Sequence, residues 1–284
     1  MYTIRSDKPL DRVTLVVLKA LHMIAAKHKA SYFIIGATAR DILMTHVFGI
    51  HSGRATRDVD FAIALEDWNQ FEIIKKEFID CGDFQSVVGE PHRLYFKQNE
   101  FGTAYPLDLI PFGRIEHAGN RIAWPPDMAV VMNVTGYAEA LVSALQVDVG
   151  DGLIANVVSI PALAVLKLLA WNERGLLDNK DAQDLFYLLR HYHEAGNAER
   201  LYEEAFSVLE TCNYDIVLAG AALLGYDANL IVEETTRQAL FDVLGDPAKR
   251  DRLVIHMDRS IASDAAIRSH FIEQFERGLS LAVL

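Results

Sequence analysis

The sequence is poor in the residues that build disulfide and zinc scaffolds. Its two cysteines, Cys81 and Cys212, lie far apart, and neither has a Cys or His at metal-ligand spacing. A disulfide framework and a structural zinc site are therefore not expected. Free cysteines behave as small apolar side chains, so we expect both to be buried.

Long apolar runs are also missing. The most apolar early stretch, residues 13–26, is interrupted by Lys19 and His22 and is too short to span a bilayer. Charged residues precede this stretch and no small-residue cleavage site follows it, which is unlike a signal peptide. We therefore expect a cytoplasmic protein with no membrane partner.

Positive charge is scarce. Lysine and arginine total 27 against 39 acidic residues, which gives a formal net charge of −12. A general nucleic-acid binder needs a basic surface to neutralise phosphates, so this balance argues against that class. It leaves room for a local basic pocket that holds a nucleoside triphosphate or the end of an RNA.

The remaining composition is that of an ordinary globular protein, with 51% hydrophobic and 23% charged residues over 284 positions. The first half alternates strand-like and helix-like segments, whereas the second half is almost entirely helical in pattern. We therefore predict a domain of mixed α and β structure over residues 1–158 and a helical domain over 159–284. The expected strands are 32–35, 58–65, 84–88, 92–97, 105–110 and 153–158. The expected helices are 9–28, 38–48, 66–80, 136–145, 161–174, 179–193, 198–211, 214–223, 229–243 and 260–279.

Two aspartates begin an otherwise apolar strand. Asp58 and Asp60 are separated by one residue, and alternate residues of a strand point to the same face, with Cα atoms about 6.5–7 Å apart. Carboxylates so placed can bridge two Mg²⁺ ions, which lie about 3.5–4 Å apart in two-metal sites. Asp108 interrupts a second apolar strand, where a buried carboxylate is costly without a partner. If the two strands are neighbours, three carboxylates converge on one metal pair.

A glycine turn precedes these strands at Gly36-Ala37-Thr38. Glycine lets the backbone approach a phosphate closely, and the following helix start offers free N–H groups and a positive dipole end. The Thr38 hydroxyl could add a further contact. The residues alone leave a second interpretation open, in which the aspartates are a solvated strand end and the glycine an ordinary turn.

Charged residues elsewhere also leave alternatives open. Lys167 lies on an apolar helix, where a lysine either reaches solvent or meets an anionic partner. Asp181 and Asp184 share a helix face, as functional acids or as acids that complement the helix dipole. Arg54 and Arg57 could clamp phosphate or RNA, pair with the aspartates, or be solvated loop charges.

Several segments together resemble a known family. Phe33-Ile-Ile-Gly-Ala-Thr-Ala-Arg-Asp41, Arg57-Asp-Val-Asp-Phe61 and Leu107-Asp-Leu-Ile-Pro-Phe112 resemble the DNA polymerase β-like nucleotidyltransferase superfamily. Lys167-Leu-Leu-Ala-Trp-Asn-Glu-Arg174 and Lys180-Asp-Ala-Gln-Asp-Leu185 resemble later motifs of its AbiEii/AbiGii abortive-infection toxin family. The implied fold is α/β (α+β), a polymerase β-like core with a mixed sheet followed by a helical domain, with the active site in the cleft between them.

The resemblance implies roles for individual residues. Asp58 and Asp60 would bind the catalytic Mg²⁺ ions, and Asp108 would be the third metal ligand, able also to help deprotonate the acceptor. The residues implied to bind nucleotide are Gly36, Ala37, Thr38, Arg40, Arg57, Lys167 and Asp181. Asp181 or Asp184 would match the last acidic motif, and Lys167 would contact the triphosphate. The family commonly has Gly-Gly or Gly-Ser at the turn, so Ala37 is a departure that removes a serine hydroxyl.

The implied activity is Mg²⁺-dependent transfer of a nucleoside monophosphate from an NTP to a hydroxyl acceptor. The resemblance suggests a tRNA end or a protein as the acceptor, and a toxin with a cognate antitoxin. Two alternatives are a non-catalytic nucleotide-binding or antitoxin-like module and a small-molecule nucleotidyltransferase of the aminoglycoside type. The Arg40-Asp41 pair also resembles tRNA CCA-adding enzymes, although their later nucleotide-selecting motifs have no convincing match.

Overall fold

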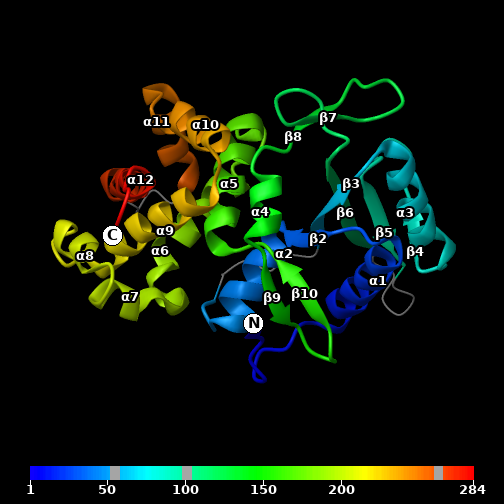
Figure 1. Ribbon diagram of the computed structural model, residues 1–284, viewed down its shortest axis with the longest axis horizontal. Helices are drawn as coiled ribbons and strands as arrows, with labels where there is room; N and C mark the ends of the chain where they lie inside the picture. The colour runs from blue at the N-terminus through cyan, green and yellow to red at the C-terminus, as the bar shows by residue number, and fades with distance from the viewer. Residues whose placement is uncertain (52–57, 98–103, 259–264) are drawn as a thin grey trace. The chain divides into compact units, whose positions relative to one another are not determined.

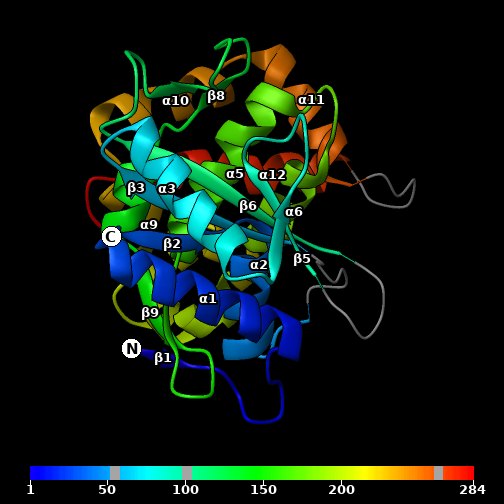
Figure 2. The ribbon, with the colours of Figure 1, turned by 90° about the vertical axis from the view of Figure 1, so that its right-hand side faces the viewer.

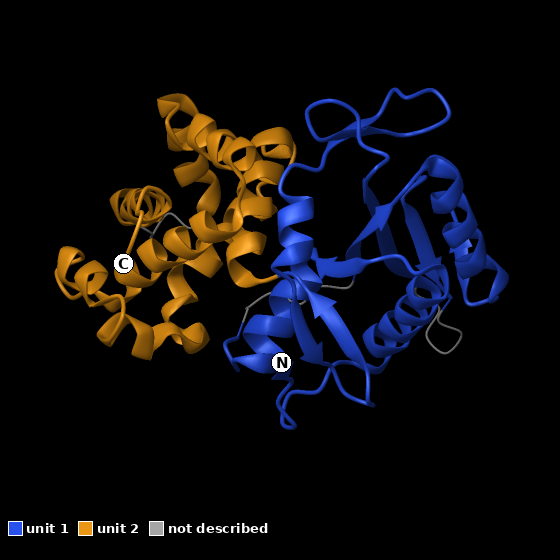
Figure 3. Cartoon of the chain, in the orientation of Figure 1, with its two compact units in different colours: residues 1–158 blue, residues 159–284 orange. Residues whose placement is uncertain are grey.

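The computed structural model describes residues 1–51, 58–97, 104–258 and 265–284. The chain divides into two compact units, residues 1–158 (unit 1) and residues 159–284 (unit 2), shown in blue and orange in Figure 3. Unit 1 contains all the strands of the described residues, and unit 2 contains helices alone. The predicted combination of α/β structure with a helical part is confirmed.

An eight-stranded sheet of described residues forms the centre of unit 1, in the order β1-β9-β10-β2-β3-β6-β5-β4 (Figure 1). Its strands are β1 (Tyr2–Thr3), β2 (Tyr32–Ile35), β3 (Val59–Leu65), β4 (Phe84–Ser86), β5 (Arg93–Phe96), β6 (Tyr105–Gly113), β9 (Leu145–Asp148) and β10 (Ile154–Val157). The sheet is mixed as expected, because β3 runs parallel to β6 and antiparallel to β2. A separate hairpin joins β7 (Arg121–Ala123) to β8 (Val131–Asn133).

Two of the described helices of unit 1 begin at a capping aspartate. The helices are α1 (Arg12–His28), α2 (Gly36–Asp41), a π-helical continuation η1 (Ile42–Val47), α3 (Trp68–Asp80) and α4 (Tyr137–Val142). The Asp11 carboxylate accepts hydrogen bonds from the first free N–H groups of α1, and Asp67 does the same for α3. The predicted helix at 38–48 is therefore one helical segment that starts two residues earlier, at Gly36.

The sheet packs apolar side chains on both faces. On one face, Phe61 of β3 contacts Phe78 of α3, with ring centroids 6.3 Å apart. On the other, Phe33 of β2 and Phe112 of β6 contact each other and Tyr137 of α4. Figure 2 shows α1 and α3 side by side along the sheet. Both faces are thus covered, which leaves the strand ends as the places where polar side chains can gather.

Unit 2 is built from α5 (Ile160–Arg174), α6 (Lys180–His191), η2 (His193–Asn197), α7 (Ala198–Tyr202), α8 (Phe206–Thr211), α9 (Ile216–Ile231), α10 (Glu234–Leu244), α11 (Pro247–Met257) and α12 (Ala265–Leu279). Helix α5 lies where the sequence predicts a helix over 161–174; Ser159 caps it and Pro161 occupies its first turn. Helices α9 and α12 pack closely: a Cβ atom at Gly225 would lie 2.1 Å from the carbonyl oxygen of Phe275.

Several sequence predictions are wrong. The predicted helix 214–223 continues to Ile231, because Gly225 serves the close packing of α9 and does not end the helix. The predicted helix 198–211 is two helices, since the backbone of Glu203 leaves the helical region (φ −115°, ψ −95°). Helix α11 and strand β9 were not predicted. Cys81 is exposed, whereas Cys212 is buried as expected.

Within the described ranges, no helix is both long and apolar enough to cross a membrane.

Candidate functional site

Two aspartates share one face of the sheet in unit 1, and a third lies just before them in the chain. Asp60 of β3 is directly paired with Asp108 of the parallel strand β6, and paired residues point to the same face. Asp58 immediately precedes β3, two residues before Asp60. Asp58 and Asp60 are half-buried and Asp108 is buried. We call Asp58, Asp60 and Asp108 the carboxylate row.

The Gly36 turn lies directly against this row. Strand β2 ends at Ile35, which pairs with Asp60, so the next residue emerges beside the Asp60 side chain. Gly36 has φ +70°, and a Cβ atom there would lie 2.2 Å from Oδ2 of Asp60. Both the backbone conformation and the contact require glycine. The glycine turn and the Asp-x-Asp strand, which follow each other in the sequence, are thus in contact in the structure.

The residues after Gly36 hold the neighbouring backbone in place. The Thr38 hydroxyl is buried and donates a 2.5 Å hydrogen bond to the carbonyl oxygen of Asp58. Arg40 is 2% exposed and donates to the Asp41 carboxylate from Nε (2.9 Å) and Nη2 (2.7 Å). Ala37 is half-buried. The Thr38 side chain thus links the start of α2 to the backbone at Asp58.

Arg93 is a member of the site that sequence reasoning missed. It is paired with Asp108 across β5 and β6, and its Nε and Nη2 atoms lie 2.6 and 2.7 Å from the two carboxylate oxygens. The hydrogen bonds to Asp108 raise the pKa of the Arg93 guanidinium, so the ion pair stays charged. The predicted strands 92–97 and 105–110 were the available signal, but their pairing register cannot be read from the sequence.

Two further titratable side chains flank the row. Burial lowers the pKa of His92, although the nearby Asp108 opposes this shift, so the imidazole is neutral near pH 7. Burial raises the pKa of Tyr105 to about 12, and its hydroxyl lies 2.8 Å from that of Thr14. Neither side chain supplies a charge at neutral pH.

The fit of the row to a metal ion can be tested on its contacts. In the part of the chain that the structure describes, no group of three or more His, Cys, Asp or Glu side chains is arranged to hold a metal. At the row, both oxygens of Asp108 are engaged by Arg93. The donor chemistry fits, because carboxylate oxygens on one face are what Mg²⁺ prefers. Asp58 and Asp60 would hold the ion, and Asp108 would complete the set on leaving Arg93.

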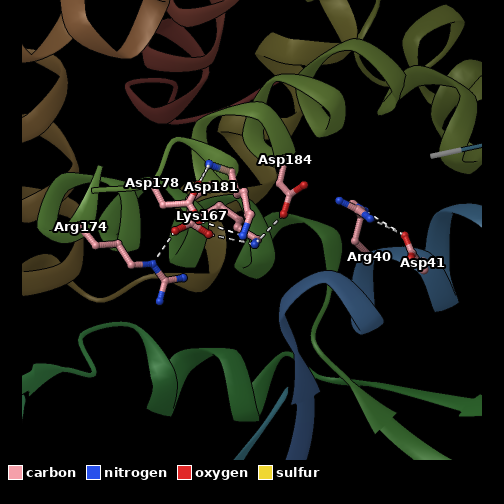
Figure 4. A network of polar contacts seen from close by, with 8 residues as sticks. Arg40, Asp41, Lys167, Arg174, Asp178, Asp181 and Asp184 are labelled. Atoms are coloured by element: carbon pink, nitrogen blue, oxygen red, sulfur yellow. Dashed lines mark hydrogen bonds and ion pairs between the residues drawn. The ribbon is translucent and has the colours of Figure 1, made fainter. Parts of the chain in front are cut away.

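Unit 2 contains a second group of predicted residues. Lys167 of α5 lies between two carboxylates of α6, with Nζ 3.0 Å from Oδ1 of Asp181 and 2.7 Å from Oδ2 of Asp184 (Figure 4). Nε of Arg174 lies 2.7 Å from the other oxygen of Asp181. We call these four residues the Lys167 network. The solvated alternative for Lys167 is wrong, because the side chain is buried and ion-paired.

Electrostatics keep the Lys167 network charged. Burial favours a neutral lysine, but the charges of Asp184 and Asp181 outweigh it and raise the pKa of Lys167. Burial likewise opposes ionisation of Asp181, while Lys167 and Arg174 lower its pKa overall. Both aspartates contact Lys167.

The predicted nucleotide ligand Arg57, like the loop residue Arg54, lies outside the described residues.

A family model described as "Nucleotidyl transferase AbiEii toxin, Type IV TA system" matches residues 22–268. The chain belongs to the AbiEii nucleotidyltransferase toxin family. This membership confirms the resemblance and supports nucleotidyl transfer as the activity of the protein. No curated protein matches the chain.

Solved structures similar to this AbiEii-family chain include an antigenic nucleotidyltransferase-like protein from Paracoccidioides brasiliensis. It is 17% identical with a TM-score of 0.43, over 76% of this chain and 94% of that protein. The antibiotic-resistance factor ANT(2'')-Ia is 13% identical, with a TM-score of 0.38 over 72% and 99% of the two chains. The CCA-adding enzyme of Thermotoga maritima, solved with tRNA, is 13% identical, with a TM-score of 0.26 over 96% and 68%. The family assignment rests on the family model.

Proposed function

We propose that this AbiEii-family protein transfers a nucleoside monophosphate from an NTP to a hydroxyl acceptor, in a Mg²⁺-dependent reaction at the carboxylate row. Residues 1–158 form the nucleotidyltransferase domain and residues 159–284 the helical domain. The observation that carries the proposal is the pairing of Asp60 with Asp108 beside the Gly36 turn, in a chain whose family transfers nucleotides.

The carboxylate row supplies the reaction centre. Asp58 and Asp60 would hold Mg²⁺, with Asp108 as the third ligand, and the ions would activate the acceptor and stabilise the departing pyrophosphate. The acceptor oxygen forms a bond to the α-phosphorus, the bond to the bridging oxygen of the β-phosphate breaks, and pyrophosphate leaves. Asp108 also helps to accept the proton that the acceptor hydroxyl releases. The hydrogen bond from Thr38 to the carbonyl oxygen of Asp58 fixes the backbone at this proposed metal ligand.

We propose several groups that hold the nucleotide phosphates. Gly36 and Ala37 offer backbone N–H groups next to the row, and Arg40 and Arg57 are cations of the same region of sequence. An ammonium has three N–H donors, and Lys167 uses two of them on Asp181 and Asp184. We assign the third donor to a triphosphate oxygen, with the two aspartates holding the lysine in position.

The acceptor is a tRNA end or a protein hydroxyl. A net charge of −12 disfavours a long nucleic-acid footprint, so an RNA acceptor would be contacted near its end. The family's description as a toxin of a toxin–antitoxin system supports a cytoplasmic toxin with a cognate antitoxin.

The test is transfer of label from α-³²P-NTPs to a cell extract in Mg²⁺. Label should appear with the wild-type protein, and Asp58→Ala should abolish it. Asp80→Asn is the matched control, because Asp80 is an exposed helix acid paired only at the surface with Lys76 among its described contacts. RNase-sensitive product identifies an RNA acceptor, and protease-sensitive product identifies a protein. Absence of nucleotide and Mg²⁺ binding in calorimetry would overturn the proposal.

A further inference from the structure

The ion pair between Arg93 and Asp108 occupies a carboxylate that the reaction needs. The guanidinium contacts both oxygens of Asp108, at 2.6 and 2.7 Å. Two parallel hydrogen bonds of this kind take up the same side of a carboxylate that a metal ion would use. Asp108 therefore cannot offer both oxygens to Mg²⁺ while Arg93 stays in this position.

The surroundings of Arg93 allow it to change partners. Its side chain is 28% exposed, whereas that of Asp108 is 12% exposed, so the guanidinium is the more accessible half of the pair. A second carboxylate lies further out: Oε1 of Glu90 is 3.8 Å from Nη1 of Arg93. The Tyr95 hydroxyl donates to the other oxygen of Glu90 at 3.3 Å and fixes it there. If the guanidinium left Asp108, Glu90 would remain nearby as an anionic partner.

Charge also favours an exchange of the partner of Asp108 over the loss of that partner. A buried carboxylate is costly without a cation, so Asp108 needs a positive partner both before and after a metal ion binds. Arg93 meets this need in the structure described here. Its planar guanidinium is equally suited to two oxygens of a phosphate.

We propose that Arg93 is a positioning residue that exchanges partners. It holds Asp108 while no metal is bound, releases Asp108 to Mg²⁺, and then binds a phosphate oxygen of the nucleotide. The proposal rests on the proposed function of the carboxylate row. Arg93 neutralises the charge of Asp108 in the metal-free site and couples Mg²⁺ binding to nucleotide binding.

The experiment measures two affinities by calorimetry on folded protein. The first is that of Mg²⁺ alone, and the second is that of each α,β-methylene NTP in the presence of Mg²⁺. Arg93→Met should tighten Mg²⁺ binding, because a competitor for Asp108 is gone, and should weaken nucleotide binding about tenfold, because a charge-assisted contact is lost. Arg114→Met is the matched control, since Arg114 pairs with Glu66 on the surface and its side chain is 80% exposed.

Circular dichroism identifies folded variants, and Arg93→Lys carries the test if Arg93→Met fails to fold. Lysine keeps the charge but contacts a carboxylate at one point, so the same opposite changes should appear at smaller size. The proposed exchange would be overturned if the Arg93 variants changed the Mg²⁺ and nucleotide affinities equally and in the same direction. It would also be overturned if both affinities equalled those of Arg114→Met. If wild-type protein binds Mg²⁺ and nucleotide while the Arg93 variants behave like the control, only this inference fails. If wild type binds neither, the proposed function itself fails.

Discussion

The two units hold their charged side chains with different access to solvent. In unit 2 the side chains of Lys167, Asp181 and Asp184 expose 10%, 5% and 4% of their surface, and the network joins α5 to α6. In unit 1 Asp58 and Asp60 are half-buried, and Arg93 exposes 28% of its side chain. The pairing chemistry is the same in both places, but a buried network fixes helices, whereas an accessible pair can exchange its partner for a ligand.

The largest expected effect concerns the carboxylate row, the more accessible of the two groups. Asp60→Asn should lower nucleotidyl transfer about a thousandfold, because a metal ligand contributes several kcal/mol and each 1.36 kcal/mol is about tenfold in rate. Stability should change little, since asparagine has the same shape. The measurements are initial rates with α-³²P-NTP and thermal unfolding, with Asp80→Asn beside them. Retention of a tenth of the wild-type rate would show that Asp60 is not a metal ligand.

For the buried Lys167 network, removal of the lysine is predicted to lower stability. Lys167→Met leaves two buried carboxylates without their shared cation and should lower the free energy of unfolding by about 3–5 kcal/mol. Arg174→Met should cost much less, because the Arg174 side chain is 57% exposed and salt-screened. Urea unfolding followed by circular dichroism measures both.

A triple variant separates charge from packing in the Lys167 network. Adding Asp181→Asn and Asp184→Asn to Lys167→Met removes the unpaired charges and should recover most of the lost stability. If Lys167→Met alone is as stable as wild type, the Lys167 network does not stabilise the fold, and the charge of Lys167 would serve nucleotide binding alone.

The sequence was sufficient for features that depend on local pattern. The strand at Val59–Leu65 follows from strict alternation, and α5 lies where a helix over 161–174 is predicted. The glycine turn, the Asp-x-Asp strand and Asp108 are all candidates for the site from sequence. The placement of Asp60 and Asp108 on one face follows from the pairing of β3 with β6.

Features set by pairing between distant segments were not predictable. Arg93 joins the site because β5 pairs with β6 in one register, and a shift by one residue would turn it to the other face. Gly225 lies inside α9 and not between two helices, because it accommodates the backbone of α12. Helix α11 differs from these features, because its Asp246 cap and Pro247 are local signals of a helix start.

A smaller effect is expected where the glycine turn meets the carboxylate row. Gly36→Ala should lower the free energy of unfolding by about 1–2 kcal/mol, the cost of a left-handed backbone for a residue with a Cβ atom. It should also reduce transfer, because the new methyl group displaces Oδ2 of Asp60. Combining it with Asp60→Ala removes the collision but not the backbone cost. A double-mutant cycle with no coupling would show that the two residues do not contact each other.

The smallest expected effect concerns how firmly the row is positioned. Thr38→Val replaces the hydroxyl that donates to the Asp58 carbonyl by a methyl group of similar size, so about 1 kcal/mol of stability should be lost. Because Asp58 begins the row, a looser backbone there should weaken Mg²⁺ affinity a few-fold, about what 1 kcal/mol gives. Thr38→Ser keeps the hydroxyl and should match wild type in both measurements. If Thr38→Val loses nucleotide affinity alone while Thr38→Ser matches wild type, the Thr38 hydroxyl acts on phosphate, and the positioning role assigned from its hydrogen bond is wrong.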